Sequence, residues 1–156
     1  MNSIDMDTAN ESGLTPAQRD DLRTIAAMMI PESAEYKVPG ADDARIQADI
    51  IATLGRDTAR MREALDQIAR LAGQPLAALD AQRREAVARE FRVGGGVAAA
   101  TLARVILQCY YRDDRVLRSL KLELRPPFPL GYTLEQGDWS LLDPVKARPS
   151  MWRRAP

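Results

Sequence analysis

The stretch VGGGVAAATLARVILQCYY, residues 93–111, constrains the fold more than any other part of the chain. From about residue 97 to residue 112 it is hydrophobic nearly all round, apart from Arg104 and Gln108. A helix with so little polar surface is stable in water only when other elements cover most of its sides. We therefore expect one central, buried helix packed among others.

Three consecutive glycines, at 94–96, stand directly before this helix. A phosphate-binding loop is one interpretation, but such a loop follows a strand, has a fixed glycine spacing and usually carries Lys, Ser or Thr at the helix start. Here a helical pattern precedes the glycines and alanines follow them. The pattern favours a flexible corner that admits the buried helix.

Helical spacing of apolar residues also runs through the rest of the first 124 residues. Thr15, Pro16 and Gln18 form the pattern of a capping box with proline at the first helical position, and Pro31 stops that helix. Further helices are predicted from Asp42 or Asp43 to about Gly55, over 57–72, from Asp80 through Phe91, and from Asp113 or Asp114 to about Leu120 or Leu122. We expect an all-α fold, a small bundle of about five to six helices.

The last 32 residues are different, because no helical or strand period runs through RPPFPLGYTLEQGDWSLLDP, residues 125–144. Residues 125–156 hold six of the ten prolines and four of the eight aromatic residues. Disordered tails are poor in aromatic residues, and long irregular segments in small domains tend to be functional or disordered. We expect residues 1–14 to be a flexible acidic leader, 15–124 a helical domain, and 125–156 an extended C-terminal arm that binds a partner. Folding of the arm back onto its own bundle is the alternative.

The composition excludes several kinds of active site. Because the chain has no histidine, it holds no Ser-His-Asp or Cys-His pair, no His-ligated metal and no haem-attachment motif. The single cysteine, Cys109, excludes an internal disulfide and a zinc cluster, and its apolar neighbours favour a core thiol over a nucleophile. Asp113 and Asp114 are better explained as helix caps than as a metal or acid–base site. We expect no catalytic, cofactor-binding or metal-binding residue in this chain.

Two further pairs have alternative interpretations. Tyr110 and Tyr111 could form a stacking platform, but one ring in the core and the other against the following loop is favoured. Met28 and Met29 could line a hydrophobic pocket, although ordinary core methionines are favoured.

Charge and hydropathy bear on partners and location. The 22 basic and 22 acidic residues interleave along the chain, so no basic face indicates nucleic-acid binding. The first 16 residues have neither a basic residue nor an apolar stretch, so no secretory or twin-arginine signal is seen. The longest apolar stretch, 97–111, is too short to span a bilayer. We expect a cytoplasmic protein without membrane insertion, periplasmic only if a signal-bearing partner exports it.

Four motifs in order resemble the gluconate 2-dehydrogenase subunit 3 family over roughly residues 20–135. They are LRTIAAMMIP ending at Pro31, PGAD at 39–42, LQCYYRDDRVLRSL at 107–120 and PPFPLGY at 126–132. The chain departs from the family pattern in lacking a twin-arginine signal and in having SLKLELRPP where a glycine usually follows the short sixth helix.

The resemblance implies a helical, non-catalytic small subunit. It would bind and stabilise the FAD-dependent catalytic subunit, of the glucose–methanol–choline (GMC) oxidoreductase type, of a sugar, glycoside or alcohol dehydrogenase. FAD would belong to that large flavoprotein subunit, and Tyr110, Tyr111, Pro129, Gly131 and Tyr132 would be structural or interface residues. A helical adaptor for an unrelated enzyme or regulator is the alternative.

The residues expected to contact the partner lie in the arm. Trp139 and Trp152 would be anchors, because large aromatic side chains dominate interface energetics. Asp138 or Asp143 would form polar contacts with the partner. The full predicted set is Phe128, Pro129, Tyr132, Asp138, Trp139, Asp143 and Trp152.

Overall fold

The computed structural model describes residues 13–124, 126, 128–132 and 136–149. The chain divides into two compact units, Met1–Leu124 and Arg125–Pro156. Across the described residues the regular structure is helical, and the only β-type pairing there is an isolated bridge between Ser33 and Val38. The predicted all-α fold is confirmed.

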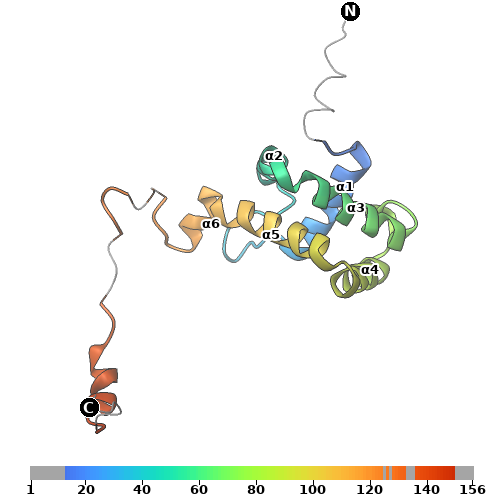
Figure 1. The fold of residues 1–156 in the computed structure, drawn as a ribbon. Coiled ribbons are helices and arrows are strands. Elements are labelled where there is room, and N and C mark those ends of the chain that lie inside the picture. Colours follow the sequence, from blue (N-terminus) through green and yellow to red (C-terminus); the bar gives the residue numbers. More distant parts are fainter. Residues whose placement is uncertain (1–12, 125, 127, 133–135, 150–156) are drawn as a thin grey trace, which may run out of the picture. The chain divides into compact units, whose positions relative to one another are not determined.

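Over residues 13–124 the first unit contains six α-helices, whose arrangement Figure 1 shows, and short 3₁₀ turns interrupt the connections between them. The helices are α1 Pro16–Met29, α2 Ala44–Thr53, α3 Thr58–Ala72, α4 Ala81–Gly94, α5 Gly96–Arg112 and α6 Asp114–Ser119, and the 3₁₀ turns are η1 Gly55–Asp57 and η2 Leu76–Ala78. The second unit contains η3 Trp139–Leu142 and α7 Asp143–Lys146.

Side-chain caps begin four of these helices. Before α1, the hydroxyl of Thr15 accepts a hydrogen bond from the Gln18 backbone N–H at 3.2 Å, and the Gln18 side chain accepts from the Thr15 N–H at 3.0 Å. This confirms the predicted capping box. Asp43, Asp80 and Asp113 cap α2, α4 and α6 more simply, because each side chain accepts from backbone N–H groups of the first turn without a reciprocal bond. Local sequence therefore sets where these helices begin.

The core forms around α5, which packs against α2, α3, α4 and α6. Its inward residues, among them Leu102, Val105 and Ile106, are buried with apolar side chains from α1, α2 and α3. The prediction of a central helix is confirmed, but the expected burial nearly all round is wrong on one side. Val97, Leu107 and Tyr111 are exposed along one stripe of α5, with Tyr111 51% accessible.

The corner between α4 and α5 depends on Gly95. A Cβ atom at this position would lie 2.6 Å from the Phe91 carbonyl oxygen and 2.7 Å from the Ala99 Cβ. Since the chain bends by 115° between the two helices, no residue larger than glycine fits here without a clash. In the described part of the chain no single helix is long and apolar enough to cross a membrane, and α4 and α5 reach that length and composition only as this bent pair.

The loop between α1 and α2 is folded against the unit. Ser33 and Val38 exchange backbone hydrogen bonds of 3.1 and 3.2 Å, and the Ala41 N–H donates to the Ile30 carbonyl at 2.8 Å. Val38 and Ala41 are buried. The buried Gln47 of α2 donates its side-chain amide to the Ala41 carbonyl at 2.8 Å. The PGAD motif is therefore an ordered connection in which both backbone polar groups of the buried Ala41 are paired.

The N-terminal end of the described chain is anchored. Leu14 is buried in the core, and the Arg62 side chain donates to the Gly13 carbonyl. Residues 1–12 of the predicted leader lie outside the described residues.

Candidate partner-binding surfaces

The C-terminal unit contains a short helical segment where the sequence predicted an irregular arm. Asp138 begins it: its Oδ1 accepts from the Ser140 backbone N–H at 3.0 Å and from the Ser140 hydroxyl at 2.6 Å. Pro144 stands in the first turn of α7, where a missing N–H costs nothing. The expectation of a wholly irregular arm is therefore wrong for residues 139–146. These turns are too short for apolar periodicity to reveal them.

Large apolar side chains of this unit are exposed to solvent. Phe128 is 86% accessible and Trp139 65%, and the Trp139 indole N–H donates to the Gln136 side-chain oxygen at 3.3 Å. Tyr132 is also exposed. Further exposed apolar residues of the unit are Leu130, Leu141, Leu142 and Val145.

The other predicted contact residues of the arm have local roles. Bonding to Ser140 holds the pKa of the Asp138 carboxyl below its ordinary value. Asp143 pairs with the Lys146 ammonium at 3.2 Å. Pro129 follows Phe128 through a cis peptide bond. Trp152 lies outside the described residues.

Arg115, at the start of α6, bonds to a nearby and to a distant carboxylate. Its Nη2 donates to Asp43 Oδ1 at 2.8 Å and its Nε donates to Asp113 Oδ1 at 2.9 Å. Bonding to this guanidinium lowers the pKa of both carboxyls. Asp43 directly follows PGAD, so the arginine ties the α1–α2 loop and the start of α2 to α6. The sequence analysis did not identify this network.

A second link runs between α2 and α5. The Arg112 Nε donates to Asp49 at 2.6 Å. One turn earlier on α5, the Cys109 thiol is buried with its Sγ 3.4 Å from the Thr53 hydroxyl, and burial raises the pKa of this thiol. The prediction of a core cysteine is confirmed, since Cys109 is only 2% accessible and belongs to the apolar core.

The two tyrosines at the end of α5 and the two aspartates that follow differ in their surroundings. Tyr110 is buried, Tyr111 is exposed, and the two rings meet edge to face with centroids 5.2 Å apart. Asp113 caps α6, and Asp114 pairs with Arg118 at 3.6 Å. Among the described residues no group of three or more acidic or cysteine side chains could hold a metal ion.

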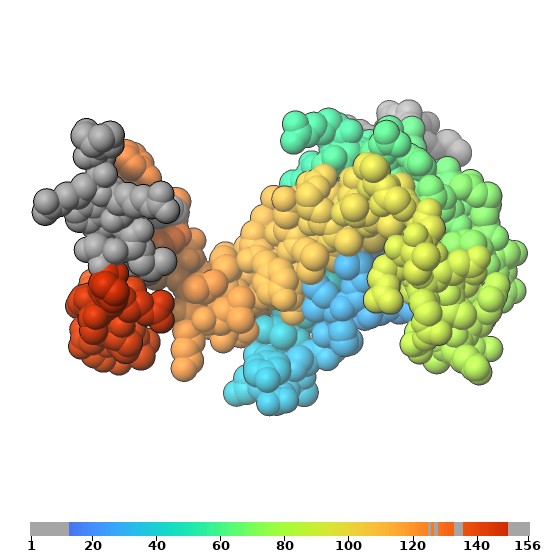
Figure 2. Space-filling model, turned by 60° about the horizontal axis from the view of Figure 1, so that its bottom comes forward, coloured from blue at the N-terminus to red at the C-terminus, as the bar shows by residue number. Residues whose placement is uncertain are grey.

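A groove of about 320 Å³ opens on the helical unit between α1, α4 and α5. These helices meet on the face shown in Figure 2, with α1 in blue, α4 in yellow-green and α5 in yellow. Met29, 36% accessible, lines the groove, so the less favoured interpretation of the methionine pair holds for this residue. The lining residues are Ile25, Met29, Glu85, Ala88, Arg89, Phe91, Arg92, Ala99, Leu102 and Ala103.

Comparison with known proteins gives no relative: no family model matches the chain, and neither a curated protein nor a solved structure matches it.

Proposed function

We propose that this chain is the non-catalytic small subunit of an FAD-dependent dehydrogenase. It binds and stabilises a catalytic subunit of the GMC type that oxidises a sugar, glycoside or alcohol. FAD and the catalytic residues belong to that large subunit. The small subunit contributes a helical domain and a C-terminal arm that binds the partner.

The exposed apolar side chains of the C-terminal unit carry this proposal. Phe128 and Trp139 present large aromatic surfaces to solvent within a segment of 32 residues. Large exposed apolar side chains gathered in one short segment favour an interaction site, and tryptophan and tyrosine are typical anchors. Prolines reduce the ordering cost of an arm when it binds, because they limit its free conformations.

The choice of a flavoprotein as partner rests on the motif resemblance. Arg115, within the motif LQCYYRDDRVLRSL, bonds to Asp113 of the same motif and to Asp43, the residue that directly follows the PGAD motif. A bond between one motif and the residue next to another gives a physical reason for both segments to occur in one chain. The resemblance is therefore supported by a contact within the fold as well as by short sequence matches.

Co-expression with a candidate flavoprotein tests the proposal. The gene adjacent to this one, if it encodes a GMC-type dehydrogenase, is the first candidate. We expect a stable complex containing FAD, and a large subunit that is poorly soluble or inactive when expressed without the small one. The purified small subunit should be colourless.

A large subunit that is equally soluble, flavin-loaded and active alone would contradict the stabilising role. Stable binding to a protein without flavin would favour the alternative, a helical adaptor for an unrelated enzyme or regulator.

A further inference from the structure

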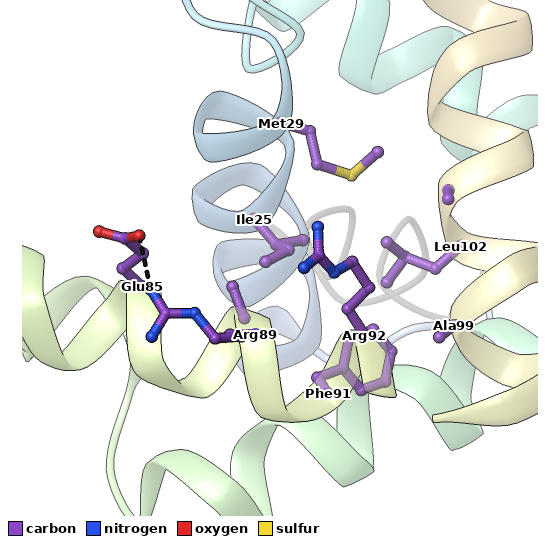
Figure 3. Close-up of a pocket in the computed structure, with 10 residues that line it drawn as sticks. Ile25, Met29, Glu85, Arg89, Phe91, Arg92, Ala99 and Leu102 are labelled. Atoms are coloured by element: carbon purple, nitrogen blue, oxygen red, sulfur yellow. Dashed lines mark hydrogen bonds and ion pairs between the residues drawn. The ribbon is translucent and has the colours of Figure 1, made fainter. Parts of the chain in front are cut away.

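The groove between α1, α4 and α5 combines an apolar floor with an unpaired positive charge. Figure 3 shows Arg92 extending from α4 so that its guanidinium lies between Ile25 and Leu102. The neighbouring charges, Arg89 and Glu85, pair with each other at 2.9 Å. Arg92 has no hydrogen bond or ion pair with any residue that the structure describes. The remaining charge at the groove is therefore one guanidinium over apolar side chains.

We propose that this groove binds an aliphatic carboxylate of medium chain length, with the chain on the apolar floor and the carboxylate on Arg92. A guanidinium presents N–H donors in a planar fork that matches the two oxygens of a carboxylate. The volume, about 320 Å³, suits roughly ten methylene-sized groups, each about as large as a water molecule. Decanoate is thus a suitable probe.

The lining favours a flexible chain over a rigid ligand. Met29 is unbranched and exposed at the groove, so it can adapt to the shape of the occupant. Alanines on α4 and α5 leave the floor open, whereas larger side chains would fill it. Since Glu85 is already paired with Arg89, it opposes a bound carboxylate less than a free acidic group would. None of this involves the arm, so the inference is independent of the proposed subunit role.

Methyl NMR on the full chain tests both binding and its location. With ¹³C-methyl methionine, decanoate titrated below its micelle concentration should shift the Met29 signal saturably at one ligand per chain. Met61 is fully buried in the core and should not move. Substitution of Met29 by leucine assigns the signal.

A comparison of related ligands distinguishes specific binding in the groove from non-specific hydrophobic binding. Octanoate should bind between two- and fourfold more weakly per methylene removed, because each buried methylene contributes up to about fourfold. Decanol, which keeps the chain and lacks the charge, should bind about tenfold more weakly. Decyltrimethylammonium should bind more weakly still.

Two variants test the named residues. Arg92→Gln should reduce decanoate binding to the level of decanol and leave decanol unchanged. Arg70→Gln, at an exposed arginine of α3 that does not line the groove, is the matched control and should change neither. Ala103→Phe should fill the groove and abolish both while the helical circular dichroism persists. If that variant fails to fold, the exposed Arg92 substitution carries the test alone.

Three results would overturn the inference. The first is an unshifted Met29 signal at saturating decanoate. The second is equal binding of decanoate, decanol and decyltrimethylammonium regardless of Arg92. The third is sedimentation showing a dimer that Arg92→Gln or Ala103→Phe dissociates, which would assign the groove to a second copy of the chain.

Discussion

Arg115 and Asp43 are 72 residues apart in sequence and form a two-pronged ion pair, with Nη2–Oδ1 at 2.8 Å and Nη1–Oδ2 at 3.2 Å. The same guanidinium bonds to Asp113, whose side chain is almost fully buried. One arginine thus links the end of the α1–α2 loop and the start of α2 to the start of α6. Its removal would leave two carboxylates close together without their counter-charge.

Arg115→Gln should destabilise the helical unit by about 1–2 kcal/mol, because the pair is charge-assisted but still partly open to water. Arg118→Gln is the control from the same helix. Its partner Asp114 lies 3.6 Å away and both side chains are largely exposed, so the loss should stay below about 0.5 kcal/mol. Urea denaturation followed by circular dichroism measures both. Equal losses would contradict the network's importance.

The effect of Arg115 should depend on pH. Arg115 lowers the folded-state pKa of Asp43 and Asp113 below their ordinary values. Their contribution is therefore fully present above the unfolded-state pKa, about 3.9, and is lost as pH falls through the folded-state values. The stability difference between the wild type and Arg115→Gln should be constant at neutral pH and shrink below about pH 4. A difference that grows on acidification would contradict this assignment.

Substitution of Asp21 should also lower the stability of the helical unit. Its carboxylate is buried in α1 and accepts a hydrogen bond from the Leu76 backbone N–H at 2.9 Å, which fixes the turn η2. Asp21→Ala leaves that N–H without a partner and should cost about 1–3 kcal/mol. Asp21→Asn keeps an acceptor oxygen and should cost less, and the exposed neighbour Asp20→Ala should cost under about 0.5 kcal/mol. If all three variants unfold at the same urea concentration, this role for Asp21 is wrong.

Two glycines should respond oppositely to alanine. At Gly40, in the PGAD motif, a Cβ would lie 2.9 Å from the Glu32 backbone nitrogen and would also meet the Asp42 side chain. Gly40→Ala should therefore cost about 1–3 kcal/mol. Gly94, the last residue of α4, has open space around the same position, so Gly94→Ala should be neutral or stabilising by up to about 1 kcal/mol. A stabilised Gly40→Ala variant in thermal unfolding would contradict the close approach.

The sequence predicted the helix starts well because the causes are local. Thr15, Asp43, Asp80 and Asp113 each cap a helix within three residues of themselves, so the pattern is visible in the chain. Burial of Cys109 also followed from its apolar neighbours, whereas the sequence predicted one buried ring of the Tyr110–Tyr111 pair without saying which.

Other features depend on packing between distant residues, and the sequence did not reveal them. The bonds from Arg115 to Asp43 and from Leu76 to Asp21 join residues 72 and 55 positions apart. The exposed side of α5 was missed because an apolar residue such as Leu107 looks the same in sequence whether or not a neighbour covers it. For the same reason Met29 was expected in the core and instead lines a groove. At residues 139–146, two short turns gave no period to detect.

Tryptophan fluorescence should report the arm alone, because both tryptophans of the chain, Trp139 and Trp152, belong to it. In a Trp152→Phe variant the emission should be that of a water-exposed indole, since Trp139 is 65% accessible. Urea should abolish the helical circular dichroism while leaving this emission almost unchanged. Blue-shifted emission that moves to the red together with the loss of helix would instead indicate an arm folded onto the bundle.

The most direct test of the proposed subunit role is the affinity of the large flavoprotein subunit for Trp139→Ala. Truncation of a large aromatic anchor should weaken the complex by about 2 kcal/mol or more, roughly thirtyfold, and Trp152→Ala should act similarly. Lys146→Ala is the matched control from the same segment. Its ion pair with Asp143 is exposed, so its effect should stay below about 1 kcal/mol. Loss of binding in the Trp139 variant, with unchanged stability of the isolated chain, is the predicted result. Normal binding by both tryptophan variants would contradict the role of the arm.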